Sequence, residues 1–197
     1  MQIVRDTDAL PKHSTVAAIG MFDGVHLGHL TLIDEVKRIA AQRHLKSAVI
    51  TFAQHPQAVL RPDSDIKMLM TVPDKVAEIG RHGIDVTVLL NFTYELSLNN
   101  SRQFLQLLRD RYGVAVLVVG YDHRFGHDKS ETFADYVRHG KELGIDVVKA
   151  PEYLGEYAPV SSSIIRRLIA SGKVDDAMRC MGRPYTLLGK VVHGFHN

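Results

Sequence analysis

Two histidines, His26 and His29, stand three residues apart in the stretch GMFDGVHLGH, with Gly28 between them. The stretch follows an apolar run and precedes a helical pattern, which places it at a strand-to-helix turn. The free N–H groups and dipole of a helix N-terminus favour an anion, and glycines let the backbone approach it closely. Two imidazoles add N–H donors at the same spot. The pattern predicts a polyphosphate cradle that stabilises charge during group transfer.

Other interpretations of this turn are weaker. One histidine could cap the helix while the other is solvated, which would be the preferred interpretation for a lone histidine. A zinc site would need a third ligand, and none is obvious in the sequence. The phosphate motifs G-x-x-x-x-G-K-[ST] and G-x-G-x-x-G are both absent.

A second cluster, VSSSIIRR, reads as another helix N-terminus, with serines as N-caps and Arg166 and Arg167 within the first turn. An ordinary capped helix with solvated arginines is the alternative. However, an arginine in the first turn opposes the helix dipole unless an anion lies there. One triphosphate held between the two helix N-termini would account for both clusters.

The elements that must position these residues alternate between apolar runs and helical patterns. We expect strands at residues 15–20, 47–52, 85–90, 114–120 and 146–150, and helices at 30–40, 73–83, 101–113, 130–144, 161–172 and 174–182. Continuous apolar strands separated by helices indicate an α/β fold, a parallel sheet of about five strands covered on both faces. Such sheets bind ligands at the carboxyl ends of their strands, which selects the turns after the first, second and fourth strands.

Length, net charge and cysteine content limit the classes of partner and the compartment that the sequence fits. The 197 residues suggest one domain, alone or with an appendage, and the net charge of only +2 argues against nucleic acid or a membrane surface as the main partner. No apolar run is long enough to cross a bilayer. The single cysteine, Cys180, excludes an internal disulfide and fits the cytoplasm, where we expect the protein.

The two clusters together are similar to the paired signature of the HxGH nucleotidyltransferases. With TFAQHP, VVGYDHRFG and GRPYTLLGKVVHG added, the whole chain resembles the N-terminal part of bacterial bifunctional riboflavin kinase/FAD synthetase. The resemblance implies a Rossmann-like, doubly wound nucleotidyltransferase fold. It implies transfer of AMP from ATP to FMN, giving FAD and pyrophosphate, by in-line attack of an FMN phosphate oxygen on the α-phosphorus. Mg²⁺ would enter with ATP and bridge its phosphates, so no protein metal site is expected.

The resemblance also assigns residues. Catalysis on the ATP phosphates is implied for His26, His29, Ser162 and Arg166. The rest of the nucleotide pocket, largely contributed by the backbone, would be Gly20, Met21, Phe22, Asp23, Gly24, Gly28, Ser161 and Ser163. The FMN side would be Phe52, His55, Pro56, Asp122, Arg124 and Phe125, with His123 in a place where family members frequently have an aromatic residue.

The resemblance further implies two units, a transferase domain at 1–183 and, at 184–197, the first strand of a riboflavin kinase domain that is normally fused at the C-terminus. The hallmark of that domain, similar to G-x-P-T-A-N, does not occur before Asn197. Three alternatives remain open: another HxGH adenylyl- or cytidylyltransferase, a flavin-nucleotide binding fragment without catalysis, and a nucleic-acid binder. The near-neutral charge and the lack of a lysine-rich second signature argue against the last.

Overall fold

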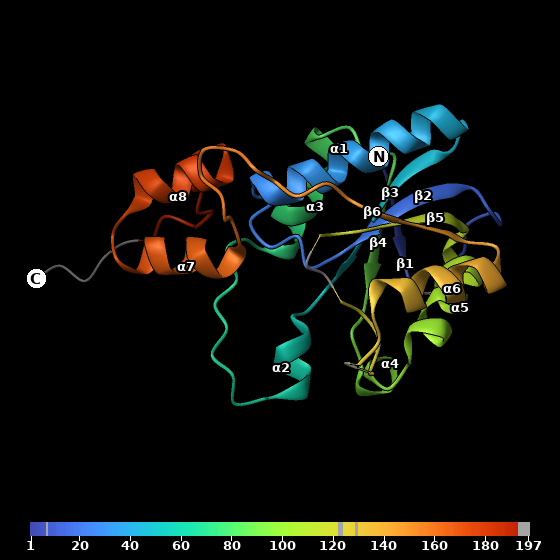
Figure 1. The fold of residues 1–197 in the computed structure, drawn as a ribbon. Coiled ribbons are helices and arrows are strands. Elements are labelled where there is room, and N and C mark those ends of the chain that lie inside the picture. Colours follow the sequence, from blue (N-terminus) through green and yellow to red (C-terminus); the bar gives the residue numbers. More distant parts are fainter. Residues whose placement is uncertain (7, 122–123, 129, 193–197) are drawn as a thin grey trace, which may run out of the picture.

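The computed structural model describes residues 1–6, 8–121, 124–128 and 130–192. Its centre is one parallel six-stranded sheet in the order β1-β4-β3-β2-β5-β6 (Figure 1). The strands are β1 (Gln2–Arg5), β2 (Thr15–Ile19), β3 (Lys46–Phe52), β4 (Val86–Leu90), β5 (Val114–Val119) and β6 (Asp146–Lys149). The five predicted strands are confirmed, and β1 is an additional edge strand.

Alternation along the central strand shows how both faces of the sheet are covered. Ala17 and Ile19 of β2 pack in one buried cluster with side chains of α5 (Ser101–Tyr112) and α6 (Phe133–Leu143), whereas Val16 and Ala18 pack in another with α1 (Leu27–Arg43) and α3 (Val72–Arg81). Because both faces are buried, the four central strands are apolar at nearly every position. The predicted sheet with helices on both faces is confirmed.

The last two helices, α7 (Ser162–Ala170) and α8 (Val174–Met181), lie to one side of the sheet (Figure 1). They share a small core of their own, which is separate from the two clusters on the sheet. Its buried residues are Leu69, Ile165, Ala177, Cys180 and Met181. Cys180 is therefore a packing residue in this structure.

Several local expectations differ from the structure. The helix after β2 begins at Leu27 rather than at residue 30, and two short helices were not predicted, α2 (Pro56–Leu60) and α4 (Tyr94–Ser97). The N-cap of α5 is Asn100, which forms a capping box with Gln103.

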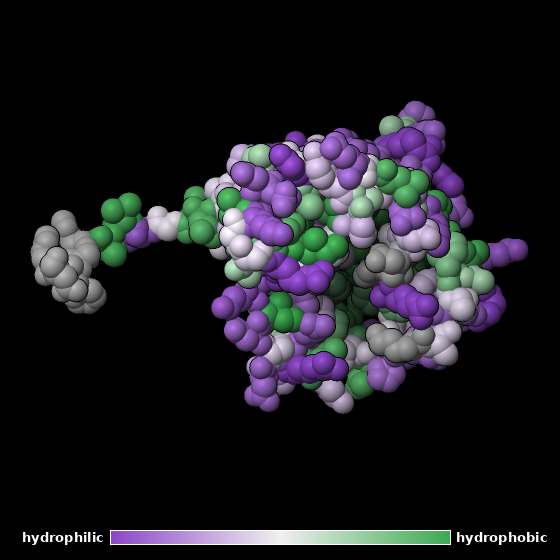
Figure 2. Space-filling view, turned by 60° about the vertical axis from the view of Figure 1, so that its left-hand side comes forward, coloured by the Kyte–Doolittle hydropathy of each residue, from purple (hydrophilic) through white to green (hydrophobic). Residues whose placement is uncertain are grey.

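Residues 184–192 form no strand: Tyr185 packs against the core of α7 and α8, and the segment then leaves the body as the projecting tail in Figure 2, where apolar side chains appear green. The exposed fractions are 77% for Leu187, 76% for Leu188, 97% for Val191 and 72% for Val192. The expected strand is therefore not formed within the described part of the tail, where no neighbouring strand pairs with it. The assignment of 184–197 to a second domain stays a prediction, and 193–197 lie outside the described residues. Over the described ranges, no helix is long and apolar enough to cross a bilayer.

Candidate active site

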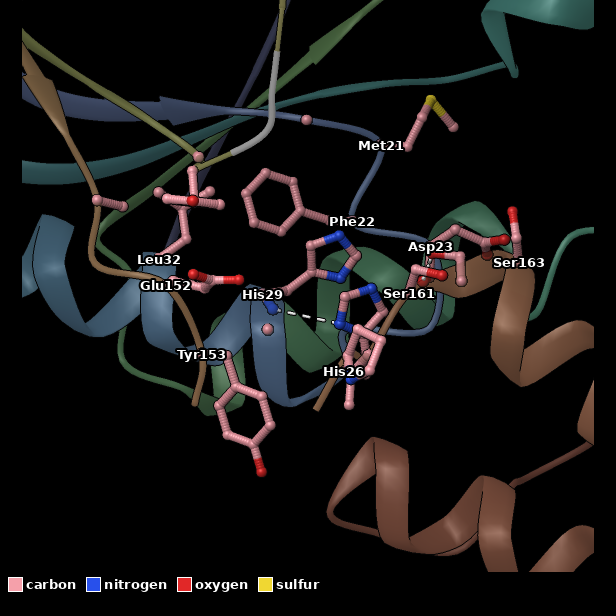
Figure 3. A pocket seen from close by; sticks show the side chains of 18 of the residues that line it. Met21, Phe22, Asp23, His26, His29, Leu32, Glu152, Tyr153, Ser161 and Ser163 are labelled. Carbon is pink, nitrogen blue, oxygen red and sulfur yellow. Dashed lines mark hydrogen bonds between the residues drawn. The ribbon is translucent and has the colours of Figure 1, made fainter. Parts of the chain in front are cut away.

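The sheet changes winding direction beside β2. The chain proceeds from β2 to β3 and β4 on one side, and then places β5 and β6 on the other side. At the carboxyl ends of these strands lies a cavity of about 450 Å³, lined by residues that follow β2, β5 and β6 and by the N-terminal ends of α1 and α7 (Figure 3). This is the edge at which parallel α/β sheets bind ligands.

The turn from β2 into α1 has an unusual backbone. Phe22, Gly24 and Val25 have positive φ angles of 50°, 82° and 38°. A positive φ is strained for a side-chain-bearing residue and especially for a β-branched one. Phe22 and Val25 are fully buried, so their packing holds the turn in place. Strain retained in this way is typical of functional sites.

The two histidines are stacked at the start of α1. The Nδ1 atom of His26 accepts a hydrogen bond from the backbone N–H of His29 at 3.3 Å, and the ring centroids lie 3.7 Å apart (Figure 3). Because Nδ1 is an acceptor, the ring proton of neutral His26 is on Nε2. His26 therefore caps the helix, as one alternative held, but it is buried, and both rings line the cavity rather than bulk solvent.

The serine cluster reaches the same cavity from α7. Ser161 is the N-cap and accepts a hydrogen bond from the backbone N–H of Ile164, while the hydroxyl of Ser162 donates to the backbone oxygen of Asp23 at 2.8 Å. All three serines and Arg166 line the cavity. The predicted meeting of two helix N-termini at one site is confirmed.

Asp23 holds this arrangement together through its side chain. The carboxylate is 1% exposed, accepts the backbone N–H of Leu69 at 2.9 Å, and pairs with Nη2 of Arg166 at 2.6 Å. Arg166 Nε also donates to the backbone oxygen of Lys67 at 2.8 Å. Arg166 is the fifth residue of α7 and Arg167 lies in its last turn, so their expected placement in the first turn was wrong, and Asp23 supplies the anion that pairs with Arg166. We expected Asp23 to contribute mainly through its backbone, whereas in the structure its carboxylate also contacts Leu69 and Arg166.

The other residues assigned to the nucleotide are placed as follows. Gly20, Met21, Phe22 and Gly28 line the cavity, whereas Gly24 does not, and its carbonyl oxygen instead accepts a hydrogen bond from Arg183 Nη2 at 2.8 Å. A Cβ on Gly28 would lie 3.3 Å from the His26 ring and 3.6 Å from the Val160 oxygen. Gly28 therefore keeps the space between the two helix N-termini open.

Sequence reasoning missed Glu152 and Tyr153, which also line the cavity and are labelled in Figure 3. They lie just beyond β6, at the same carboxyl edge. Extending the argument about strand ends to the fifth predicted strand would have found them.

Four of the six residues assigned to FMN line a second cavity, of about 640 Å³ and mainly apolar. Phe52, Pro56, Arg124 and Phe125 line it, together with Phe92 and Phe104 among others. Ile19, the last residue of β2, lines both cavities, so they are neighbours. Asp122 lies outside the described residues.

His55 lines the first cavity rather than the apolar one. It caps α2, and its Nδ1 accepts the backbone N–H of Gln57 at 3.2 Å. Burial lowers the pKa of His55, as do the charges of Arg166 and Lys75, while Asp23 opposes this shift. A neutral imidazole with its proton on Nε2 follows, and this atom is an additional N–H donor on the wall of the first cavity.

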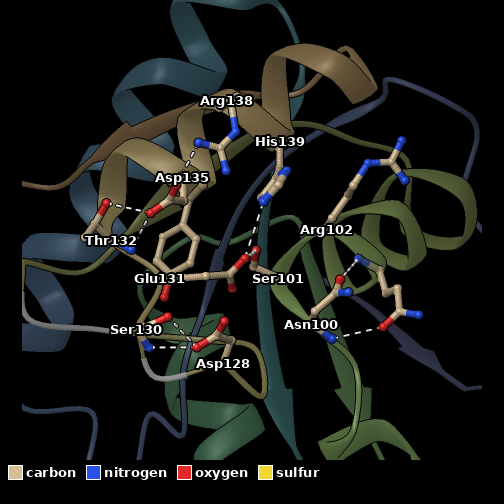
Figure 4. Close-up of polar contacts among 12 residues, drawn as sticks. Asn100, Ser101, Arg102, Asp128, Ser130, Glu131, Thr132, Asp135, Arg138 and His139 are labelled. Carbon is tan, nitrogen blue, oxygen red and sulfur yellow. Dashed lines mark hydrogen bonds and ion pairs between the residues drawn. The ribbon is translucent and has the colours of Figure 1, made fainter.

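Residues 124–127 form one wall of the apolar cavity. Polar contacts between the segment that follows them and the start of α5 hold this wall in place (Figure 4). The hydroxyl of Ser101 donates to Glu131 at 2.7 Å, and Glu131 lies 3.3 Å from Nε2 of His139. The backbone N–H of His127 donates to the oxygen of Asn99 at 2.8 Å. A Cβ on Gly126 would lie 2.7 Å from the backbone nitrogen of Ser101, so only glycine fits there. The segment is thereby anchored to the start of α5.

Among the described residues, no group of three histidine, cysteine or acidic side chains is arranged to hold a metal ion. The Asp23 carboxylate in the cavity is already bonded to Arg166 and Leu69. A divalent cation accompanying a nucleotide would take most of its ligands from phosphate and water.

Comparisons with a family model and with curated proteins agree on one protein family. Residues 9–164 match the model of the FAD synthetase family. The chain is 33% identical over 193 residues to a bifunctional riboflavin kinase/FMN adenylyltransferase of Listeria monocytogenes, covering 95% of this chain and 60% of the relative. A protein of the same name from Bacillus subtilis is 34% identical over 184 residues, covering 91% and 57%. The chain thus spans about 60% of the length of these curated relatives.

Among solved structures, a Streptococcus pneumoniae protein titled macrolide-efflux protein superposes with a TM-score of 0.80 at 24% identity. The match covers 94% of this chain and 72% of that chain. At this identity the likeness supports the fold alone, and it agrees with the α/β architecture described above.

Proposed function

We propose that this chain, which belongs to the FAD synthetase family, transfers the AMP part of ATP to FMN and releases pyrophosphate. The observation that carries the proposal is the pair of neighbouring cavities. One has two helix N-termini, two stacked histidines and an arginine, and the other is large, apolar and lined by phenylalanines. A triphosphate suits the first cavity and an isoalloxazine ring suits the second.

In this proposal Mg²⁺ enters with ATP as part of the substrate. The N–H groups at the start of α1 and α7, with His26, His29 and Arg166, would bind the phosphates. An oxygen of the FMN phosphate attacks the α-phosphorus, the bond from that phosphorus to the bridging oxygen breaks, and pyrophosphate leaves with the bonding electrons. FMN already carries the nucleophile, so the protein contributes positioning and charge stabilisation.

His55 lies between the two cavities, because it lines the phosphate cavity while its neighbour in the sequence lines the apolar cavity. Pro56, the next residue, lines the apolar cavity. The neutral Nε2–H of His55 would donate to the FMN phosphate near the reacting centre. The relatives are named for a riboflavin kinase as well, and we propose that such a domain is the usual fusion partner of this unit.

The test is a product assay on the 197-residue chain. ATP and Mg²⁺ are supplied with either FMN or riboflavin, and the flavins are separated by chromatography. We expect FAD from FMN and no FMN from riboflavin.

His29→Ala serves as the low-activity control and His44→Asn as the neutral one, because His44 is exposed at the C-terminal end of α1 with a φ of 55° that asparagine tolerates. Flavin binding without any FAD would contradict the catalytic proposal and favour a binding fragment. Formation of a different adenylylated product would favour another HxGH transferase.

A further inference from the structure

Lys75 of α3 is completely buried. It is not among the site residues expected from the sequence, and it has no part in the proposed mechanism. Its Nζ donates to the backbone oxygen of Phe52 at 2.8 Å and to that of Met21 at 3.1 Å. A buried amine is costly unless its hydrogens are bonded, and these two carbonyl groups accept two of the three hydrogens of the ammonium form. A methionine or leucine would fill a helix-to-sheet interface without that cost.

The two carbonyl groups belong to different walls of the site. Met21 lines the phosphate cavity, and Phe52 lines the apolar cavity. Met21 follows β2 and Phe52 is the last residue of β3, and these paired neighbouring strands end at the same edge of the sheet. The oxygen of Met21 also accepts the hydroxyl of Thr51 at 2.9 Å. One amine therefore joins the backbones of the two walls just beyond the point where strand pairing ends.

We propose that Lys75 is a positioning residue that fixes the distance between the phosphate cavity and the apolar cavity, so that the two substrates meet in line. The inference rests on the proposed function and deepens it. The reaction needs two bound molecules to approach at one angle, and a displacement of about 1 Å in such a site typically costs about a hundredfold in rate. Lys75 lines neither cavity, so it acts on the positions of the two walls through the Met21 and Phe52 carbonyl groups, while its charge also lowers the pKa of His55.

The first experiment compares Lys75→Met with Lys141→Met, a change of the same kind at an exposed position on α6. Dissociation constants for MgATP and for FMN are measured separately by calorimetry, and kcat is measured by FAD formation. We expect Lys75→Met to lower kcat about a hundredfold, with each dissociation constant within about threefold of wild type. Lys141→Met should match the wild type.

Two results would overturn the inference. One is a folded Lys75→Met protein whose kcat stays within threefold of wild type. The other is a rise in both dissociation constants that accounts for the whole loss of activity, because a merely structural lysine would damage each site by itself.

A second variant covers the case in which Lys75→Met does not fold. Thr51→Val removes the other side-chain donor to the Met21 oxygen while keeping the β-branched shape. It should lower kcat about fivefold without changing either dissociation constant, since one neutral hydrogen bond is lost. Unchanged kcat in Thr51→Val would then overturn the inference. If both single variants fold, the double variant should lose less than the product of their effects, because both act on the same carbonyl group.

Failure of the proposed function is distinguished by the wild-type chain in the same assay. If the wild type makes no FAD, the function is refuted, and the role of Lys75 is tested by binding alone. FMN affinity is then measured with and without a non-hydrolysable ATP analogue. A change in this coupling in Lys75→Met supports the positioning role, and identical coupling in both proteins overturns it.

Discussion

Replacing Asp23 by asparagine removes the buried negative charge that orients Arg166. Asparagine keeps an oxygen for the backbone N–H of Leu69, so the substitution isolates the ion pair from the hydrogen bond. Losing one partner of a fully buried pair costs about 3–5 kcal/mol, and exposed pairs contribute about 0.2–1 kcal/mol. The Asp23 side chain is 1% exposed and that of Arg166 is 23% exposed, so water can recover part of the arginine's hydration. We therefore expect the free energy of unfolding to fall by about 2 kcal/mol.

In the assay, urea unfolding is followed by circular dichroism, and the transition in which the Asp23–Arg166 contact is lost is extrapolated linearly to water. Asp34→Asn is the matched control, since Asp34 is 75% exposed and lies 3.8 Å from Lys37 on the surface of α1. It should change the free energy of unfolding by less than about 0.5 kcal/mol. Turnover of FMN to FAD should fall in Asp23→Asn and not in Asp34→Asn, because only the first change frees the Arg166 guanidinium to reorient.

Equal stabilities for Asp23→Asn and Asp34→Asn would refute the reasoning, since the buried pair would then contribute no more than a surface pair. Added MgATP offers a further check. A polyphosphate supplies a replacement for the lost negative charge, so saturating MgATP should narrow the stability gap between wild type and Asp23→Asn. A gap that widens with MgATP would show that Asp23 does not share Arg166 with the phosphates.

Three further predictions follow from single contacts. His29→Ala should lower kcat by roughly a hundredfold, about 3 kcal/mol in the transition state, and leave FMN affinity nearly unchanged, and wild-type turnover would exclude its role in the phosphate cradle. Gly24→Ala should destabilise the chain by at least about 1 kcal/mol more than Gly172→Ala in thermal unfolding, because both have a positive φ but only the Cβ at Gly24 would meet Leu69, at 2.7 Å. Burial lowers the pKa of Lys75 from 10.5 to about 8, so the unfolded chain binds the extra proton between these values and stability rises with pH there. Urea unfolding at pH 7.5 and pH 10 should therefore show wild type gaining about 2–3 kcal/mol relative to Lys75→Met, and a constant difference would contradict the shift.

Local patterns in the sequence predicted the sheet and the convergence of two helix N-termini, because strand apolarity, caps and turn glycines act over a few residues. They missed β1, whose four residues include only one buried side chain, Val4, and which pairs with β4 far along the chain. The roles of the Asp23 side chain and Lys75 were also out of reach. Each depends on partners far away in the sequence, 143 residues for the Asp23–Arg166 pair and 54 for Lys75–Met21, and no local pattern records such contacts.

The separate small core of α7 and α8 has a consequence for partial unfolding. These helices bury their apolar residues mainly against each other and Leu69, and polar contacts such as Asp23–Arg166 and Arg183–Gly24 join them to the turn after β2. The two helices should therefore detach as one cooperative unit while the six-stranded sheet stays intact. Mild denaturant would then separate the serines and Arg166 from the histidines, and the chain would lose activity well before it loses its strands.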